Sequence, residues 1–142
     1  MAHERNRVLV IEDDTAIGAV VETILEGEGF PVTVVQECSP VEVERWIGHE
    51  LPACVLLDGG GSDGFGESWH TAALLRAHSP PIPVVMFSAD QAATVEARAG
   101  RSARSREAGF AAVLDKPFDL DALIDAVTGI VYGPEAGSAT SR

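Results

Sequence analysis

Residues 8–14 of the chain read VLVIEDD, four consecutive apolar residues followed by three consecutive acids. An unbroken apolar run of this length is typical of a strand that is buried on both faces of a parallel sheet. The acids stand where such a strand would end, and ligands bind at the carboxyl edge of a parallel sheet. We therefore expect residues 8–11 to form a strand, and Glu12 and Asp13 to lie at a binding edge.

Similar apolar runs recur along the chain, and segments with helical spacing separate them. In the last helical segment, Asp119 is placed as the N-cap, and Leu120 and Leu123 begin an apolar face. Strands that alternate with helices in this way favour an α/β fold with a doubly wound parallel sheet. The predicted strands are residues 8–11, 32–35, 54–57, 84–87 and 111–114, and the predicted helices lie near 17–25, 40–47, 67–77, 91–108 and 120–131.

Length and charge narrow the function classes. The chain has 142 residues, which is enough for one domain with its own core. Its 22 acidic and 10 basic residues give a formal net charge of −12, and a field of this sign repels nucleic acid and anionic membranes. The apolar runs are too short for a membrane span or for the core of a signal peptide. We therefore expect a cytoplasmic protein with no nucleic-acid and no membrane partner.

Polar residues follow the other strands as well. Asp58 follows the third predicted strand, Ser88 follows the fourth, and Lys116 comes shortly after the fifth. Clustered carboxylates attract a cation, and ligands that offer only oxygen suit Mg²⁺. A lysine and a hydroxyl at the same edge can hold two oxygens of a phosphoryl group. The pattern indicates phosphoryl transfer to a carboxylate, with Mg²⁺ as the cofactor.

These residues together make the chain resemble the receiver domains of two-component response regulators. The resemblance covers residues 6–132 and implies a flavodoxin-like fold of five βα units with strand order 2-1-3-4-5. It is carried by VLVIEDD at 8–14, VLLD at 55–58, DGF at 63–65, PVVMFSA at 83–89, and EAG at 107–109 leading to DKPF at 115–118.

The resemblance implies a phosphoacceptor and a metal site. It makes Asp58 the phosphoacceptor, and it matches Glu12 and Asp13 to the acidic pair of the family. Asp13 would ligate Mg²⁺ directly, and Glu12 would do so directly or through water. Asp58 and the backbone carbonyl of Gly60 would supply the remaining protein ligands.

Two more residues would act on the phosphoryl group, by the same resemblance. Ser88 matches the hydroxyl residue that hydrogen-bonds it, and Lys116 matches the lysine that pairs with it. The peptide bond between Lys116 and Pro117 would be cis.

The resemblance also implies the partners. The phosphoryl group would come from a sensor histidine kinase, from a phosphotransfer protein or from a small acyl phosphate. Phosphorylation would reshape the face formed by the fourth helix, the fifth strand and the last helix, which an unknown output protein would read. The habit of the family also allows a homodimer through this face. The chain would then be a signalling module and not an enzyme, since a phosphohydrolase would need an acid where Gly60 stands.

The chain departs from the family pattern in three places. Residues 59–61 are Gly-Gly-Gly in a shortened loop. This predicts weak Mg²⁺ binding, because fixing a glycine backbone costs more conformational entropy than fixing other residues. Val113 stands where the family often has an aromatic residue that acts as a switch. Both features favour the alternative that the chain is a receiver-like protein-interaction module that works without phosphorylation. The third departure is a long segment between Ser88 and Lys116 with four arginines, which forms either a solvated helix face or a docking patch.

We divide the chain into a receiver domain, residues 6–132, and a flexible C-terminal tail, residues 133–142, whose residues are mostly small and polar. It would be a stand-alone receiver, or a fragment of a longer regulator or hybrid kinase in which the tail would serve as a linker.

Overall fold

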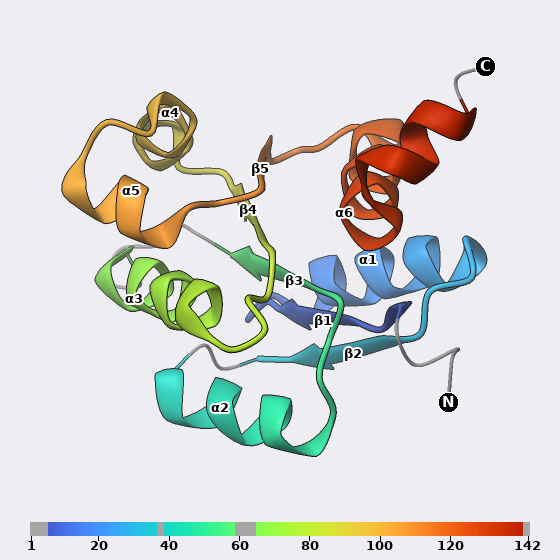
Figure 1. The fold of residues 1–142 in the computed structure, drawn as a ribbon, viewed down its shortest axis with the longest axis horizontal. Helices are drawn as coiled ribbons and strands as arrows, with labels where there is room; N and C mark the ends of the chain where they lie inside the picture. Colours follow the sequence, from blue (N-terminus) through green and yellow to red (C-terminus); the bar gives the residue numbers. More distant parts are fainter. Residues whose placement is uncertain (1–5, 37–38, 59–64, 141–142) are drawn as a thin grey trace.

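A single five-stranded parallel sheet with helices on both faces forms the fold (Figure 1). The computed structural model describes residues 6–36, 39–58 and 65–140. The strands lie in the order β2-β1-β3-β4-β5, which confirms the predicted order. The elements are β1 (Val8–Ile11), α1 (Thr15–Gly27), β2 (Val32–Val35), α2 (Pro40–His49), β3 (Cys54–Asp58), α3 (Phe65–Ala77), β4 (Val84–Ser88), α4 (Gln91–Ala99), α5 (Ala103–Ala108), β5 (Ala112–Asp115) and α6 (Leu120–Thr140).

The first apolar run is an inner strand, as its composition predicts. β1 lies between β2 and β3, with Val8 opposite both Val32 and Cys54, and all four of its residues are buried. Because the strands are parallel and in register, their carboxyl ends meet at one edge of the sheet. The acids that follow β1 therefore lie beside the end of β3.

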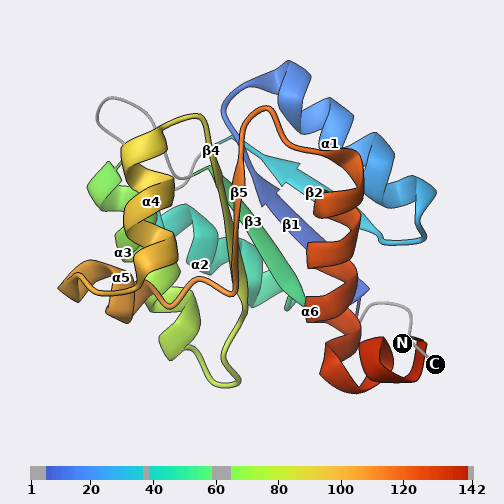
Figure 2. The same cartoon turned by 90° about the horizontal axis from the view of Figure 1, so that it is seen from above.

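Two groups of helices cover the two faces of the sheet (Figure 2). On one face, Val21 and Leu25 of α1 and Leu123 and Val127 of α6 pack in one apolar cluster with residues of the strands. The other face is covered by α2, α3, α4 and α5 in a second cluster. Burial of these apolar side chains is the largest favourable contribution to folding, at about 25 cal/mol per Å² of apolar surface.

The helix that leads away from the first acids begins at a side-chain cap. One carboxylate oxygen of Asp14 accepts hydrogen bonds from the amides of Ala16 and Ile17, at 3.0 and 3.2 Å. Asp14 is thus the N-cap of α1, and its carboxylate is turned to the helix instead of to the other two acids.

The predicted single helix over residues 91–108 is wrong, because the chain breaks there into α4 and α5. Gly100 ends α4 in the left-handed conformation, with φ of 65°, and Ser102 begins α5 by accepting a hydrogen bond from the amide of Ser105. A glycine that ends one helix and a serine that caps the next are strong enough signals to stop an alanine-rich helix.

The backbone after the predicted domain is helical. α6 runs to Thr140, with a kink at Gly133, where φ is 80° and ψ is 169°. The small and polar residues at 133–142 predict a loose tail without regular structure, and the flexibility of that segment stays a prediction. Within the described residues, no helix combines the length and the apolar character that crossing a membrane requires.

Candidate functional site

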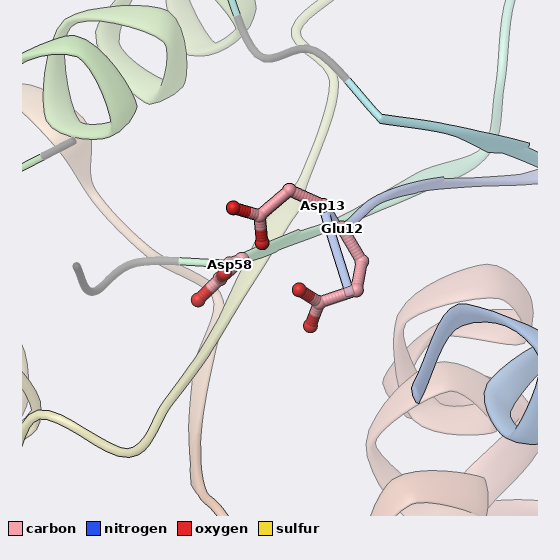
Figure 3. A group of neighbouring side chains, drawn as sticks. All are labelled: Glu12, Asp13 and Asp58. Atoms are coloured by element: carbon pink, nitrogen blue, oxygen red, sulfur yellow. The ribbon is translucent and has the colours of Figure 1, made fainter. Parts of the chain in front are cut away.

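The ends of four strands build one site at the carboxyl edge of the sheet. Glu12 and Asp13 follow β1, and Asp58 ends β3 (Figure 3). Backbone hydrogen bonds hold these ends in place: the amide of Glu12 donates to the carbonyl of Val35 at 3.0 Å, and the amide of Lys116 donates to the carbonyl of Ser88 at 2.9 Å. The sheet therefore fixes the spacing of the site residues.

Three carboxylates meet at this edge. Glu12, Asp13 and Asp58 each offer one oxygen, and these three oxygens lie within 4.8 Å of one another. The Glu12 residue is 1% exposed, Asp13 is exposed, and Asp58 is half-buried. A set of three carboxylate oxygens with an open side suits a hard divalent cation that keeps several waters, as Mg²⁺ does. The predicted fourth protein ligand, the carbonyl of Gly60, lies outside the described residues.

The ammonium group of Lys116 lies between two of the carboxylates. Its Nζ is 2.6 Å from Oε1 of Glu12 and 3.3 Å from Oδ1 of Asp58. It also lies 4.7 Å from the ring centroid of Phe87, over the ring. Only 13% of the Lys116 side chain is exposed, so its charge acts in a partly dry environment. The resemblance predicts that Lys116 pairs with a phosphoryl group, and its pairing with Glu12 is a finding of the structure.

Glu12 is held on both oxygens. Oε1 accepts the hydrogen bond from Lys116, and Oε2 accepts one from the amide of Asp14 at 3.0 Å. Burial raises the pKa of Glu12 to about 7, although Lys116 and the Asp14 amide pull it down, and the charge of Asp58 raises it further. Burial outweighs the cation, so in this structure the Glu12 carboxyl group exchanges its proton near neutral pH.

Ser88 is buried at the end of β4. Its Oγ accepts a hydrogen bond from the amide of Asp90 at 2.9 Å, and a hydroxyl that accepts in this way keeps its own proton for a further acceptor. On the next strand, the Lys116–Pro117 peptide bond is cis. The structure thus brings Ser88 and Lys116 to the edge where Asp58 lies, because Ser88 pairs with Asp115 across the sheet.

Val113 is a half-buried residue of β5 that packs against the core. The chain therefore has a small aliphatic side chain where the resemblance predicts an aromatic switch. The aromatic residues of the same core cluster are Trp69 and Phe110, which pack edge to face with ring centroids 5.3 Å apart.

The arginines of the long segment mostly bind within the molecule. Arg98 forms an ion pair with Asp115, and Arg104 forms one with Glu96 and lies over the ring of Trp69, 4.2 Å from its centroid. The side chains of Arg98 and Arg104 are 47% and 42% exposed, so the two sequence-based alternatives, a solvated face and a docking patch, stay predictions. The partners are on other elements, and no local pattern in the sequence could have paired them.

Known proteins share both the sequence pattern and the fold. Residues 8–128 match the sequence model of a family described as the response regulator receiver domain. A response regulator from Thermotoga maritima is 24% identical with a TM-score of 0.71, and the match covers 90% of this chain and 98% of that one. A response regulator receiver protein from Burkholderia phymatum is 23% identical with a TM-score of 0.69, covering 90% and 96%. A response regulator receiver domain protein from Methanospirillum hungatei JF-1 is 23% identical with a TM-score of 0.70, covering 89% and 93%. No curated protein matches the chain.

Proposed function

Because this chain belongs to the family of response regulator receiver domains, we propose that it accepts a phosphoryl group on Asp58 and signals the change to a partner protein. Receiver domains are signalling modules that act with histidine kinases or phosphotransfer proteins. In this chain the acceptor is the carboxylate of Asp58, and Lys116, Ser88 and Mg²⁺ assist the transfer.

The observation that carries the proposal is the position of Lys116. Its ammonium group lies 3.3 Å from Oδ1 of Asp58 and is itself held by the buried Glu12. A cation in this position reduces the repulsion between an acidic site and an incoming anionic phosphoryl group. Asp58 is half-buried and therefore reachable, while Glu12 is enclosed and paired on both oxygens. Of the two, Asp58 is the carboxylate suited to act as the nucleophile.

The transfer exchanges one bond to phosphorus for another. A carboxylate oxygen of Asp58 attacks the phosphorus of a phosphohistidine, the O–P bond forms, and the N–P bond breaks, with its electron pair staying on the imidazole nitrogen. The ammonium of Lys116 and the hydroxyl of Ser88 each donate to one oxygen of the transferred group. Both donors stand at the sheet edge before the reaction, and each side chain turns from its present partner to reach the transferred group.

The carboxylates fit Mg²⁺, and the residues that would hold it are Asp13 and Asp58, with Glu12 as a direct or water-mediated ligand and the Gly60 carbonyl as a further one. When bound, Mg²⁺ offsets the negative charge that gathers on the phosphoryl oxygens. Asp13 is the exposed member of the set, so it is open to a hydrated ion that keeps part of its water shell.

The signal would leave through the face formed by α4, β5 and α6. This corresponds to the predicted output face, with α6 as the helix that follows β5. Ser88 leads directly into the loop before α4, and Lys116 directly follows β5, so a change at either residue reaches this face through a short stretch of backbone. An output protein, or a second copy of the chain, would bind there.

A second candidate function keeps the fold without the chemistry. Val113 favours it, because a valine on β5 cannot swing a ring between the surface and the interior. In that case the chain would bind its partner in one state only, as a protein-interaction module.

A mass measurement separates the two functions. The protein is incubated with acetyl phosphate and Mg²⁺, and intact mass is recorded for wild type, for Asp58→Ala and for a metal-free control. We expect wild type to gain one phosphoryl group only with Mg²⁺, and the variant to gain none. If wild type gains none and also fails to bind Mg²⁺ or beryllofluoride, the interaction module replaces the phosphoacceptor.

A further inference from the structure

An arginine on α4 clasps the end of β5. Nη2 of Arg98 lies 2.7 Å from Oδ2 of Asp115, and Nη1 lies 3.3 Å from Oδ1. Nη2 also donates to the backbone carbonyl of Val113 at 3.1 Å. Arg98 thus binds β5 through three hydrogen bonds, and its planar guanidinium group meets the carboxylate with both nitrogens. We call these contacts the Arg98 clasp.

The contact with Arg98 changes the pKa of Asp115. Its pKa is lowered, first by the hydrogen bond from Arg98 and then by one from Thr94, which is also on α4. Arg98 is therefore the main cause of the lowered pKa of Asp115.

Apart from the clasp, α4 packs on the core mainly with small side chains, Ala93 and the partly buried Ala97. Its buried residues are Ala93 and Thr94, both small, while Val95 is 60% exposed. A helix that buries so little apolar surface gains only a small hydrophobic contribution, and polar contacts make up a larger share of its attachment. The Arg98 clasp is for this reason well placed to control where α4 lies against β5.

The strand and the helix that the clasp joins each adjoin a phosphoryl-binding residue, at the end of β5 and at the start of α4. Asp115 immediately precedes Lys116, and the Oγ of Ser88 holds the amide of Asp90, the N-cap of α4. An open groove of about 430 Å³ runs along this face, and its lining includes Ser88 and Lys116 at the site and Arg98 and Asp115 at the clasp. The site and the clasp are therefore parts of one continuous surface.

We propose that the Arg98 clasp stabilises the unphosphorylated arrangement of the receiver. The clasp thereby weakens the binding of a phosphoryl group at Asp58. This rests on the proposed function. To bind the phosphoryl group, Lys116 must turn from Glu12, and Ser88 must point its hydroxyl toward Asp58. These movements act on the end of β5 and on the start of α4, and the clasp joins the last turn of the same helix to β5. A contact that favours one arrangement weakens the binding of any ligand that favours the other. By linkage, such a ligand weakens the contact by the same free energy.

The test measures the affinity for beryllofluoride, a phosphoryl mimic, in the presence of Mg²⁺. We expect Arg98→Ala to bind it about two- to five-fold more tightly than wild type, within the range that exposed ion pairs are worth. Coulomb attraction alone gives the opposite sign, because loss of a nearby positive charge weakens the binding of an anion. Arg101→Ala is the matched control, since it removes an exposed arginine from the segment that follows α4, and we expect it to bind no more tightly than wild type.

A second measurement distinguishes regulation from simple support of the fold. We expect beryllofluoride to speed amide hydrogen exchange in α4 of wild type, and to change it much less in Arg98→Ala, where the helix is already released. Asp115→Asn removes the other end of the clasp. The double variant should bind beryllofluoride much as Asp115→Asn alone does, because a broken clasp cannot be broken twice.

The outcomes separate the two levels of the account. Wild type that binds beryllofluoride, with Arg98→Ala equal to wild type or weaker, overturns the role of the clasp and leaves the proposed function standing. If Arg98→Ala does not fold, Asp115→Asn tests the clasp instead. Asp121→Asn on α6 is its control, because it removes the same charge outside the clasp. If the affinity for beryllofluoride rises equally in these two variants, the inference is overturned. Wild type that does not bind beryllofluoride overturns the proposed function and this inference together.

Discussion

Nζ of Lys116 lies 2.6 Å from Oε1 of Glu12, although the two residues are 104 positions apart in the chain. The contact joins the end of β1 to the residue after β5, on opposite sides of β3 and β4 in the sheet order. It gives the buried carboxylate a partner and leaves the same cation within 3.3 Å of Asp58. In the absence of a metal ion, Lys116 is therefore the cation that offsets the charges of Glu12 and Asp58.

Removal of the Lys116 ammonium group should destabilise the protein in the absence of Mg²⁺, by an amount that depends on pH. Lys116→Met leaves the buried Glu12 without its ionic partner, and loss of one member of a buried pair costs about 3–5 kcal/mol. We expect a loss near the lower end of that range at pH 8, and a smaller loss at pH 5, where Glu12 is protonated. Urea unfolding at the two pH values measures both. Equal losses would contradict the pairing.

The raised pKa of Glu12 sets a second pH dependence. Between the ordinary value of 4.5 and the folded value of about 7, the folded state binds more protons than the unfolded state. The stabilisation is fully present below pH 4.5 and is lost as the pH rises through 7, with a slope of at most about 1.4 kcal/mol per pH unit. We expect Glu12→Gln to remove this slope from the free energy of unfolding without Mg²⁺. A slope that persists in the variant would assign it to another group.

The Mg²⁺ site can be tested with two neighbouring acids. Asp13 belongs to the carboxylate cluster, whereas Asp14 caps α1. We expect Asp13→Asn to weaken Mg²⁺ binding by about ten-fold or more, since ligand-set changes have effects of at least this size. Asp14→Asn should change it little, because asparagine also caps helices. Calorimetry of Mg²⁺ binding gives both affinities, and equal losses would mean that net charge, not ligation, controls binding.

The break between α4 and α5 should be visible in stability. Gly100→Ala places a side chain at φ of 65°, which costs about 1 kcal/mol or more for a residue with a Cβ atom. Gly48→Ala is the matched control in α2, where nothing lies within 4 Å of the added Cβ atom, and it should stabilise by about 0.5–1 kcal/mol. Thermal unfolding of the two variants should thus show shifts of opposite sign. Stabilisation by Gly100→Ala would support one continuous helix.

Local patterns predicted the strands well, since unbroken apolar runs leave little choice to a chain of this size. β1 matches its predicted bounds, and β3 and β4 each extend one residue beyond theirs, to Asp58 and Ser88. The strand order came from the resemblance and not from the runs themselves. The split of residues 91–108 can be predicted from Gly100 and Ser102, because these two helix-ending signals outweigh the helix propensity of the alanines around them.

The pairings of the site were beyond local patterns. The contacts of Lys116 with Glu12 and of Arg98 with Asp115 depend on which strands are neighbours and on side-chain reach, and neither follows from spacing along the chain. The sequence showed which residues would come to the edge of the sheet, and the fold determined which of them touch. The predicted role of the Gly60 carbonyl stays a prediction.

The most direct test of the central claim is to locate the phosphoryl group on a residue. Protein treated with acetyl phosphate and Mg²⁺ is reduced with borohydride, which converts an acyl phosphate to an alcohol and releases phosphate. Peptide mass spectrometry then reads which aspartate has become homoserine. The account predicts homoserine at position 58 alone, only in samples that received both Mg²⁺ and the phosphoryl donor. Homoserine at Asp13, or reduction at no aspartate while the intact mass shows a phosphoryl group, would contradict it.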